Sequence, residues 1–109
     1  RKSGEFSKLR EITFELTSNL FIAFNCAAEP TLGTFLGLGS SAAAEVCALS
    51  GFDWLLVDLE HGSGGEDVLL GQILAASVHQ VPLLVRVETD DRIRTGRVLD
   101  LGAAGVMFP

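Results

Sequence analysis

Apolar and polar residues follow a regular pattern from about residue 31 onward. Short apolar runs at residues 34–36, 53–59, 81–87 and 105–108 predict strands, and segments with helical spacing of apolar residues lie between them. This β-α-β-α-β-α-β order with short connections predicts a parallel sheet with right-handed crossovers. Two α/β architectures share the order, an open doubly wound sheet and a (β/α)₈ barrel, of which this chain would supply the first three to four units.

Residues that favour helix ends mark the three expected helices. Serines at 40–41 can cap the first and aspartates at 90–91 the third, while residues 63–66, Ser-Gly-Gly-Glu, have the pattern of a capping box for the second. In the second and third helices, apolar residues at helical spacing are expected to face inward: Leu69, Leu70, Ile73 and Leu74, then Ile93, Val98, Leu99 and Leu101.

Residues 1–30 lack the regular pattern of apolar and polar residues seen in the rest of the chain. We interpret them as an N-terminal extension that precedes the domain at 31–109. Basic residues precede an apolar stretch there, as in a targeting peptide, but Glu5, Glu11 and Glu15 argue against one. One amphipathic helix is the alternative. The location, cytoplasmic or organellar (plastid or mitochondrion), therefore stays open.

Composition excludes several classes of partner. The net charge of −6 and the lack of a basic patch argue against a nucleic-acid surface. Mean hydropathy is high at +0.38, but no run of about 18 apolar residues predicts a membrane span. The chain begins with Arg1 and stops at Pro109 directly after a strand-like run, so we expect a fragment of a longer protein.

A glycine loop offers one functional hypothesis. Gly37 and Gly39 open a G-x-G-x-x-A motif between a strand and a helix, and Asp58 follows about 20 residues later at the end of the next strand. A dinucleotide-binding half-domain needs these features. A tight strand-to-helix turn that requires glycine also explains the motif, and it is the explanation that we favour.

Polar residues at the ends of two apolar strands offer a second functional hypothesis. Asp58, Glu60 and His61 end the Trp-Leu-Leu-Val strand, and the carboxyl ends of parallel strands are where α/β proteins place their sites. Histidine suits proton transfer near neutral pH. Arg86 ends the next strand, where it could bind a carboxylate or form a buried ion pair with Asp58 or Glu88. Asp100 lies late in the third helix, against the helix dipole, so we expect it to have a partner.

Four segments in register carry a family resemblance. They are G-T-F-L-G-L-G-S-S, A-E-V-C-A-L-S-G-F-D-W-L-L-V-D-L-E-H-G, P-L-L-V-R-V and V-L-D-L-G-A-A-G-V-M-F-P. Over residues 31–109 the chain resembles the HpcH/HpaI aldolases, which include 2-keto-3-deoxy-L-rhamnonate aldolase. The resemblance implies a (β/α)₈ TIM barrel of the phosphoenolpyruvate/pyruvate type. It also implies a class II lyase that cleaves 4-hydroxy-2-oxo acids to pyruvate and an aldehyde.

The resemblance also implies roles for individual residues. His61 matches the family's catalytic base, Asp100 the acid that pairs with it, and Arg86 the arginine that binds the pyruvate moiety. Asp58 and Glu60 would support these three from the same pocket.

A divalent metal, Mg²⁺, Mn²⁺ or Co²⁺, would polarise the 2-oxo group, but its Glu and Asp ligands are expected beyond Pro109. By resemblance the longer protein would be a homo-oligomer. The fragment alone is expected to be inactive. A non-catalytic remnant of an aldolase, or a dinucleotide-binding half-domain, remains the alternative.

Overall fold

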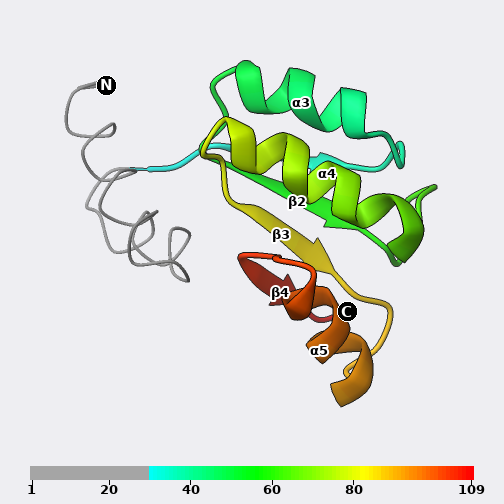
Figure 1. The fold of residues 1–109 in the computed structure, drawn as a ribbon. Coiled ribbons are helices and arrows are strands. Elements are labelled where there is room, and N and C mark those ends of the chain that lie inside the picture. Colours follow the sequence, from blue (N-terminus) through cyan, green and yellow to red (C-terminus); the bar gives the residue numbers. More distant parts are fainter. Residues whose placement is uncertain (1–29) are drawn as a thin grey trace.

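The computed structural model describes residues 30–109, so nearly all of the expected N-terminal extension lies outside the described residues. The described part alternates strands and helices in the predicted order (Figure 1). Its elements are β1 (Gly33–Leu36), α3 (Ser41–Leu49), β2 (Trp54–Asp58), α4 (Glu66–Val78), β3 (Leu83–Arg86), α5 (Arg92–Asp100) and β4 (Gly105–Met107). No helix in residues 30–109 combines the length and apolar character needed to cross a bilayer.

The four strands form one parallel sheet in the order β1-β2-β3-β4. Each crossover therefore steps in the same direction, and right-handed connections then place every helix on the same face. Buried residues of all three helices indeed join one core with one face of the sheet, including Ala44 of α3, Leu69 of α4 and Val98 of α5. A dinucleotide-binding sheet would instead place its fourth strand beside β1. The observed order is that of a partial (β/α)₈ barrel.

The two faces of the sheet have different contents because side chains alternate along each strand. Leu55 and Val57 of β2 pack with Val85 of β3 against the helices. The opposite face carries Phe35 and Leu56 at one level, in register with each other. Asp58 and Arg86 lie on that face where β2 and β3 end, in register as the last pair.

Two helix caps form as expected and one does not. The side chain of Ser40 accepts a hydrogen bond from the Ala43 N–H, and that of Asp91 accepts one from the Arg94 N–H. The capping box predicted at residues 63–66 is wrong: α4 has Gly65 as its N-cap, without a side-chain hydrogen bond.

The inward faces of α4 and α5 are narrower than the apolar pattern predicts. Leu69, Ile73 and Val98 are buried as expected. Other predicted inward residues, Leu70, Leu74, Ile93 and Leu99, are exposed, and the buried face of α4 includes Gln72 and Ala76 instead. On α4 the buried stripe is centred on Leu69 and Ala76, so it is rotated away from Leu70 and Leu74, which face outward.

Candidate functional site at the carboxyl edge of the sheet

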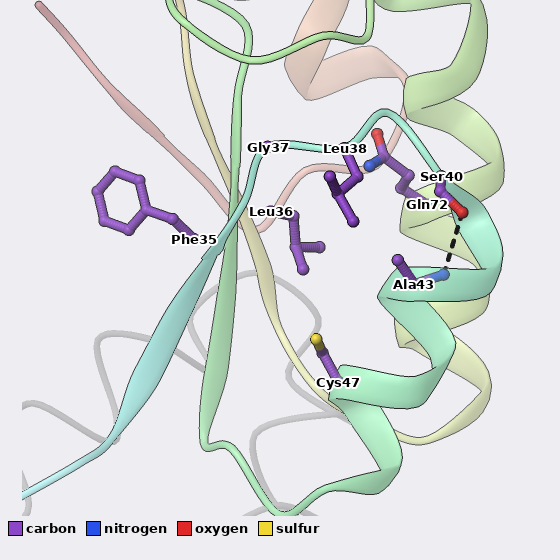
Figure 2. A pocket seen from close by; sticks show the side chains of 8 residues that line it. All are labelled: Phe35, Leu36, Gly37, Leu38, Ser40, Ala43, Cys47 and Gln72. Carbon is purple, nitrogen blue, oxygen red and sulfur yellow. Dashed lines mark hydrogen bonds between the residues drawn. The ribbon is translucent and has the colours of Figure 1, made fainter.

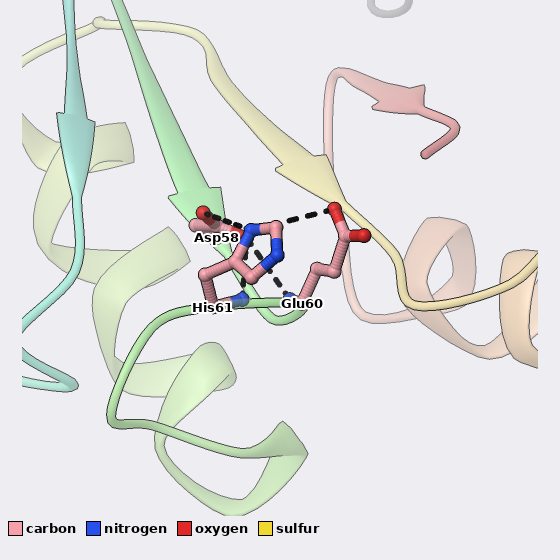
Figure 3. A group of neighbouring side chains, drawn as sticks. All are labelled: Asp58, Glu60 and His61. Atoms are coloured by element: carbon pink, nitrogen blue, oxygen red, sulfur yellow. Dashed lines mark hydrogen bonds and ion pairs between the residues drawn. The ribbon is translucent and has the colours of Figure 1, made fainter.

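Asp58 organises the turn that follows β2. Its Oδ1 accepts hydrogen bonds from the backbone N–H groups of Glu60, at 2.9 Å, and of His61, at 3.0 Å. Its carbonyl oxygen accepts a third from Gly62, at 3.0 Å. Asp58 thus caps the turn as aspartates often do. The side chains of Glu60 and His61 are thereby held at the carboxyl edge of the sheet (Figure 3).

Arg86 of β3 reaches across to the same carboxylate. Its Nε donates to Asp58 Oδ1 at 3.0 Å, and its Nη2 donates to Oδ2 in a bidentate pair. Hydrogen bonding by Arg86 lowers the pKa of Asp58 from 3.8 to about 2, helped by the two backbone N–H groups and opposed by burial. The same contact raises the pKa of Arg86. Of the two ion-pair partners that the sequence left open for Arg86, the structure selects Asp58.

The guanidinium also contacts Glu60, His61 and an aromatic ring. Its Nε lies 3.3 Å from Glu60 Oε2, and its carbon lies 5.6 Å from the centre of the Phe35 ring. Nη2 lies 2.8 Å from His61 Nδ1. Because a guanidinium can only donate, Nδ1 must accept, which places the proton of a neutral imidazole on Nε2. Arg86 is therefore shared by both carboxylates and the imidazole.

The side chains of Asp58, Glu60 and His61 are of the types that bind metal ions. Ligand atoms of Asp58, Glu60 and His61 lie within 4.8 Å of one another, close enough to surround one ion. However, both carboxylate oxygens of Asp58 and the Nδ1 of His61 are already engaged by Arg86 and by backbone N–H groups. A metal ion bound to Asp58 and to His61 Nδ1 would lie beside the positive guanidinium and compete with it, so the trio as arranged fits an ion-pair cluster around Arg86 better than a resident metal.

Asp100 is not brought to this cluster. It is the last residue of α5, its side chain is exposed, and the chain then reaches Ala104, whose N–H donates to Leu83 O at the start of β3. Asp100 therefore lies toward the amino edge of the sheet, whereas His61 follows the carboxyl edge. The carboxylates near His61 Nδ1 are those of Glu60, at 3.6 Å, and Asp58, at 3.8 Å. Within this chain these two contacts surround His61 Nδ1, and the expected pairing of Asp100 with His61 stays a prediction.

The glycine loop packs against the turn that carries His61. Gly37 O accepts a hydrogen bond from Ser63 N–H at 2.8 Å. Gly39 has a φ of +61°, and a Cβ there would lie 2.7 Å from Gly64 Cα. Glycine is therefore needed for this close approach of two loops, which is the second of the two explanations that the motif allowed.

A charged network beside the site was not evident in the sequence. Arg94 of α5 donates to both carboxylate oxygens of Glu88, at 2.9 and 2.6 Å, and also binds Glu66 at the start of α4. Arg97 donates to Glu66 at 2.8 Å. These hydrogen bonds lower the pKa of Glu66, mainly through Arg97, and that of Glu88 through Arg94. The network ties α4, the segment after β3 and α5 together, and no spacing within one helix reveals it.

The chain matches the HpcH/HpaI aldolase/citrate lyase family over residues 31–109. It belongs to that family. An HpcH/HpaI relative named hydroxypyruvate/pyruvate aldolase, from Paraburkholderia phytofirmans, is 41% identical over 83 residues, covering 74% of this chain and 32% of the relative. The 4-hydroxy-2-oxo-heptane-1,7-dioate aldolase of Escherichia coli is 36% identical over 91 residues, covering 84% of this chain and 35% of that enzyme.

Solved structures of HpcH/HpaI proteins share the fold. A family protein from Burkholderia cenocepacia superposes with a TM-score of 0.76 at 36% identity, covering 85% of this chain and 37% of that one. Macrophomate synthase gives a TM-score of 0.69 at 30% identity, covering 83% and 31%. The chain thus spans about a third of the length of these relatives.

Proposed function

We propose that this chain is part of a metal-dependent class II aldolase that cleaves 4-hydroxy-2-oxo acids to pyruvate and an aldehyde. The main supporting observation is that the Arg86 guanidinium lies beside the His61 imidazole. Asp58 and Glu60 hold both groups at the carboxyl edge of the strands. Active sites of (β/α)₈ enzymes lie at that edge. Family membership supports the same reaction class, since relatives carry aldolase names.

Arg86 would bind the anionic end of the substrate. Its side chain is 23% exposed and already oriented by Asp58, so little conformational entropy is lost when a carboxylate arrives. To form a bidentate pair with a substrate carboxylate, the guanidinium must give up its contact with His61 Nδ1. Substrate binding would therefore free that nitrogen.

His61 would then act as the base. Its side chain is 66% exposed, which leaves it accessible to substrate. Freed Nδ1 can accept the proton of the substrate's 4-hydroxyl, while the C3–C4 bond breaks and its electron pair forms the enolate of pyruvate. The protonated imidazole then returns that proton to C3 of the enolate, which gives pyruvate and restores the base, and the aldehyde leaves. Glu60 and Asp58, rather than Asp100, lie where they can stabilise the protonated imidazole.

A divalent metal such as Mg²⁺, Mn²⁺ or Co²⁺ would supply Lewis-acid polarisation of the 2-oxo group in such an enzyme. The described residues do not themselves fit that ion, so we propose that its ligands lie outside these 109 residues. The chain alone would then be inactive, and a barrel of about the relatives' length, as a homo-oligomer, would be the working enzyme.

The test is an aldol-cleavage assay on a protein in which this chain is continued to the length of its relatives. Treatment with EDTA should remove pyruvate release, and Mn²⁺ or Mg²⁺ should restore it. His61→Ala should lower kcat by about 100-fold or more while pyruvate still binds. Turnover that resists EDTA and gives a borohydride-trapped lysine adduct would instead indicate a Schiff-base aldolase and reject the proposal.

A further inference from the structure

A partly open pocket of about 90 Å³ lies at the end of β1, mainly on the helix side of the sheet (Figure 2). Phe35, one of the residues that line it, also contacts Arg86. It is formed by the end of β1, the loop that follows it, and the facing sides of α3 and α4. Most of its surface is apolar, with Leu36, Ala43 and Cys47 among the walls. None of the residues that line it is charged, so an ion would find no counter-charge there.

Gln72 of α4 provides the main polar group of this pocket. Its side chain is 1% exposed, and neither its amide oxygen nor its amide nitrogen has a hydrogen-bond partner among residues 30–109. Buried amides are almost always paired, because an unpaired donor or acceptor loses its hydration without compensation. Figure 2 shows the amide extending from α4 toward Leu38 at one end of the pocket. A guest that both donates and accepts would satisfy it.

Ser40 adds a second polar contact at the same end. Its Oγ accepts from the Ala43 N–H at 3.2 Å, which leaves the hydroxyl proton available to donate. The pocket thus pairs a polar end, Gln72 and Ser40, with an apolar body. Water alone would hydrate the polar end but would lack partners against the apolar walls.

The size of the pocket limits the guest. A dry cavity of about 150 Å³ accommodates benzene, which has six non-hydrogen atoms. By proportion, this pocket of about 90 Å³ encloses roughly four, and a further atom of the guest can extend through its open side.

We propose that the pocket binds a small uncharged molecule whose polar head both donates to and accepts from the Gln72 amide. A primary amide with a short apolar tail has this chemistry, because two amides can pair through reciprocal N–H to O=C hydrogen bonds. The proposal does not depend on aldolase activity.

A guest bound in this pocket should change the position of the turn that carries His61. Gly37, which lines the pocket, accepts the Ser63 N–H at 2.8 Å, and Gly39 touches Gly64. A guest that moves the glycine loop therefore moves the segment directly after His61. The close contact between the two loops would therefore transmit binding in the pocket to the turn that carries His61.

The experiment is a two-dimensional ¹⁵N NMR titration, with propionamide, of the protein in which this chain is continued to the length of its relatives. Saturable shifts are expected for the Gln72 side-chain NH₂ and for the backbone amides of Gly37 and Ser63. Gln72→Met, which keeps the side-chain length, should weaken binding at least about tenfold. Ser77→Ala, an exposed change on the same helix, should leave binding unchanged.

Two further measurements keep the test decisive. Propionate has the same shape but is an anion, so it should cause no saturable shift. If Gln72→Met fails to fold, Ala43→Met fills the pocket from its opposite wall and should abolish binding. Equal shifts with propionate, no saturable shift with propionamide, or ordered water that stays on the Gln72 amide in excess propionamide would each overturn the proposal.

Discussion

At the scale of single residues, Arg86 connects most of the candidate site. Its guanidinium contacts Asp58, Glu60, His61 and the face of Phe35. Removing it would leave two carboxylates beside each other without their shared cation. The side chain therefore has two separable roles, binding an anionic substrate and neutralising the turn after β2.

Arg86→Met should raise KM for a 2-oxo acid substrate roughly 10- to 100-fold in the barrel-length protein, since one charge-assisted contact contributes on that order. Steady-state kinetics measures it. Arg92→Met is the matched control, because Arg92 is exposed at the start of α5, and it should leave KM unchanged. A similar rise in KM for both variants would contradict the assignment of Arg86.

Asp58 gives a prediction about acid stability. Its pKa falls from 3.8 to about 2 on folding, so its ionised form stabilises the fold above pH 4, and this contribution is lost as the pH falls through about 2. Asp58→Asn should therefore lower the free energy of unfolding at pH 7 by roughly 1 to 2 kcal/mol, allowing for solvent at the open edge. Urea unfolding from pH 7 to pH 2 measures the difference between the two chains, which should shrink toward the acid end. A difference that does not change with pH would count against the Arg86 pairing.

The sequence identified the residues of the site better than their partners. Strand ends pointed to Asp58, His61 and Arg86, because polar residues after a buried run must leave the core. The pairing of His61 with Asp100 stays a prediction, since the carboxylates within 4 Å of His61 among residues 30–109 are those of Glu60 and Asp58. The contact of Arg86 with both Asp58 and His61 depends on the register of β2 and β3, which only the fold defines.

At the scale of elements, the loop between β1 and α3 shows why two glycines of one motif differ. Gly39→Ala should lower the free energy of unfolding by roughly 1 to 3 kcal/mol, because alanine meets both the positive φ and the backbone of Gly64. Gly37→Ala has open space around its Cβ and should stay within about 0.5 kcal/mol of the parent. Chemical denaturation of both variants checks this, and equal losses would contradict the packing explanation.

The start of α4 shows a limit of local sequence patterns. Ser63 and Glu66 have capping-box spacing, yet Glu66 binds Arg94 and Arg97 from α5 instead of closing the box. A charge-assisted contact between elements outweighs a local cap, and the partner lies 28 residues away in the chain. The element itself was predicted correctly, while its first turn was not.

At the scale of the whole molecule, the described sheet has two open edges, β1 and β4. Its concave face also exposes Phe35 and Met107, at 51% and 40%. Unpaired edges beside apolar side chains favour association between copies of a chain. The order of strands and helices predicted the parallel sheet and the first three to four units of a barrel, and residues 30–109 have four strands and three helices in that order.

The isolated 109-residue chain should therefore self-associate at micromolar concentration. Met107→Lys, at the β4 edge, should reduce that association, because a charge at an edge opposes strand pairing. Val78→Lys, an equally apolar and 75% exposed site on α4, is the control and should have a smaller effect. Sedimentation velocity measures the species present, and a monomer for the unsubstituted chain at all concentrations would refute the prediction.

The strand order also bears on how the chain folds during synthesis. Each strand pairs with the strand made just before it, so every pairing is available as soon as its second member leaves the ribosome. The segment that must close between two neighbouring strands contains only one helix. The entropic cost of adding each strand is therefore small. The sheet can consequently lengthen one β-α unit at a time from β1, with the residues of the site assembled once β3 has joined.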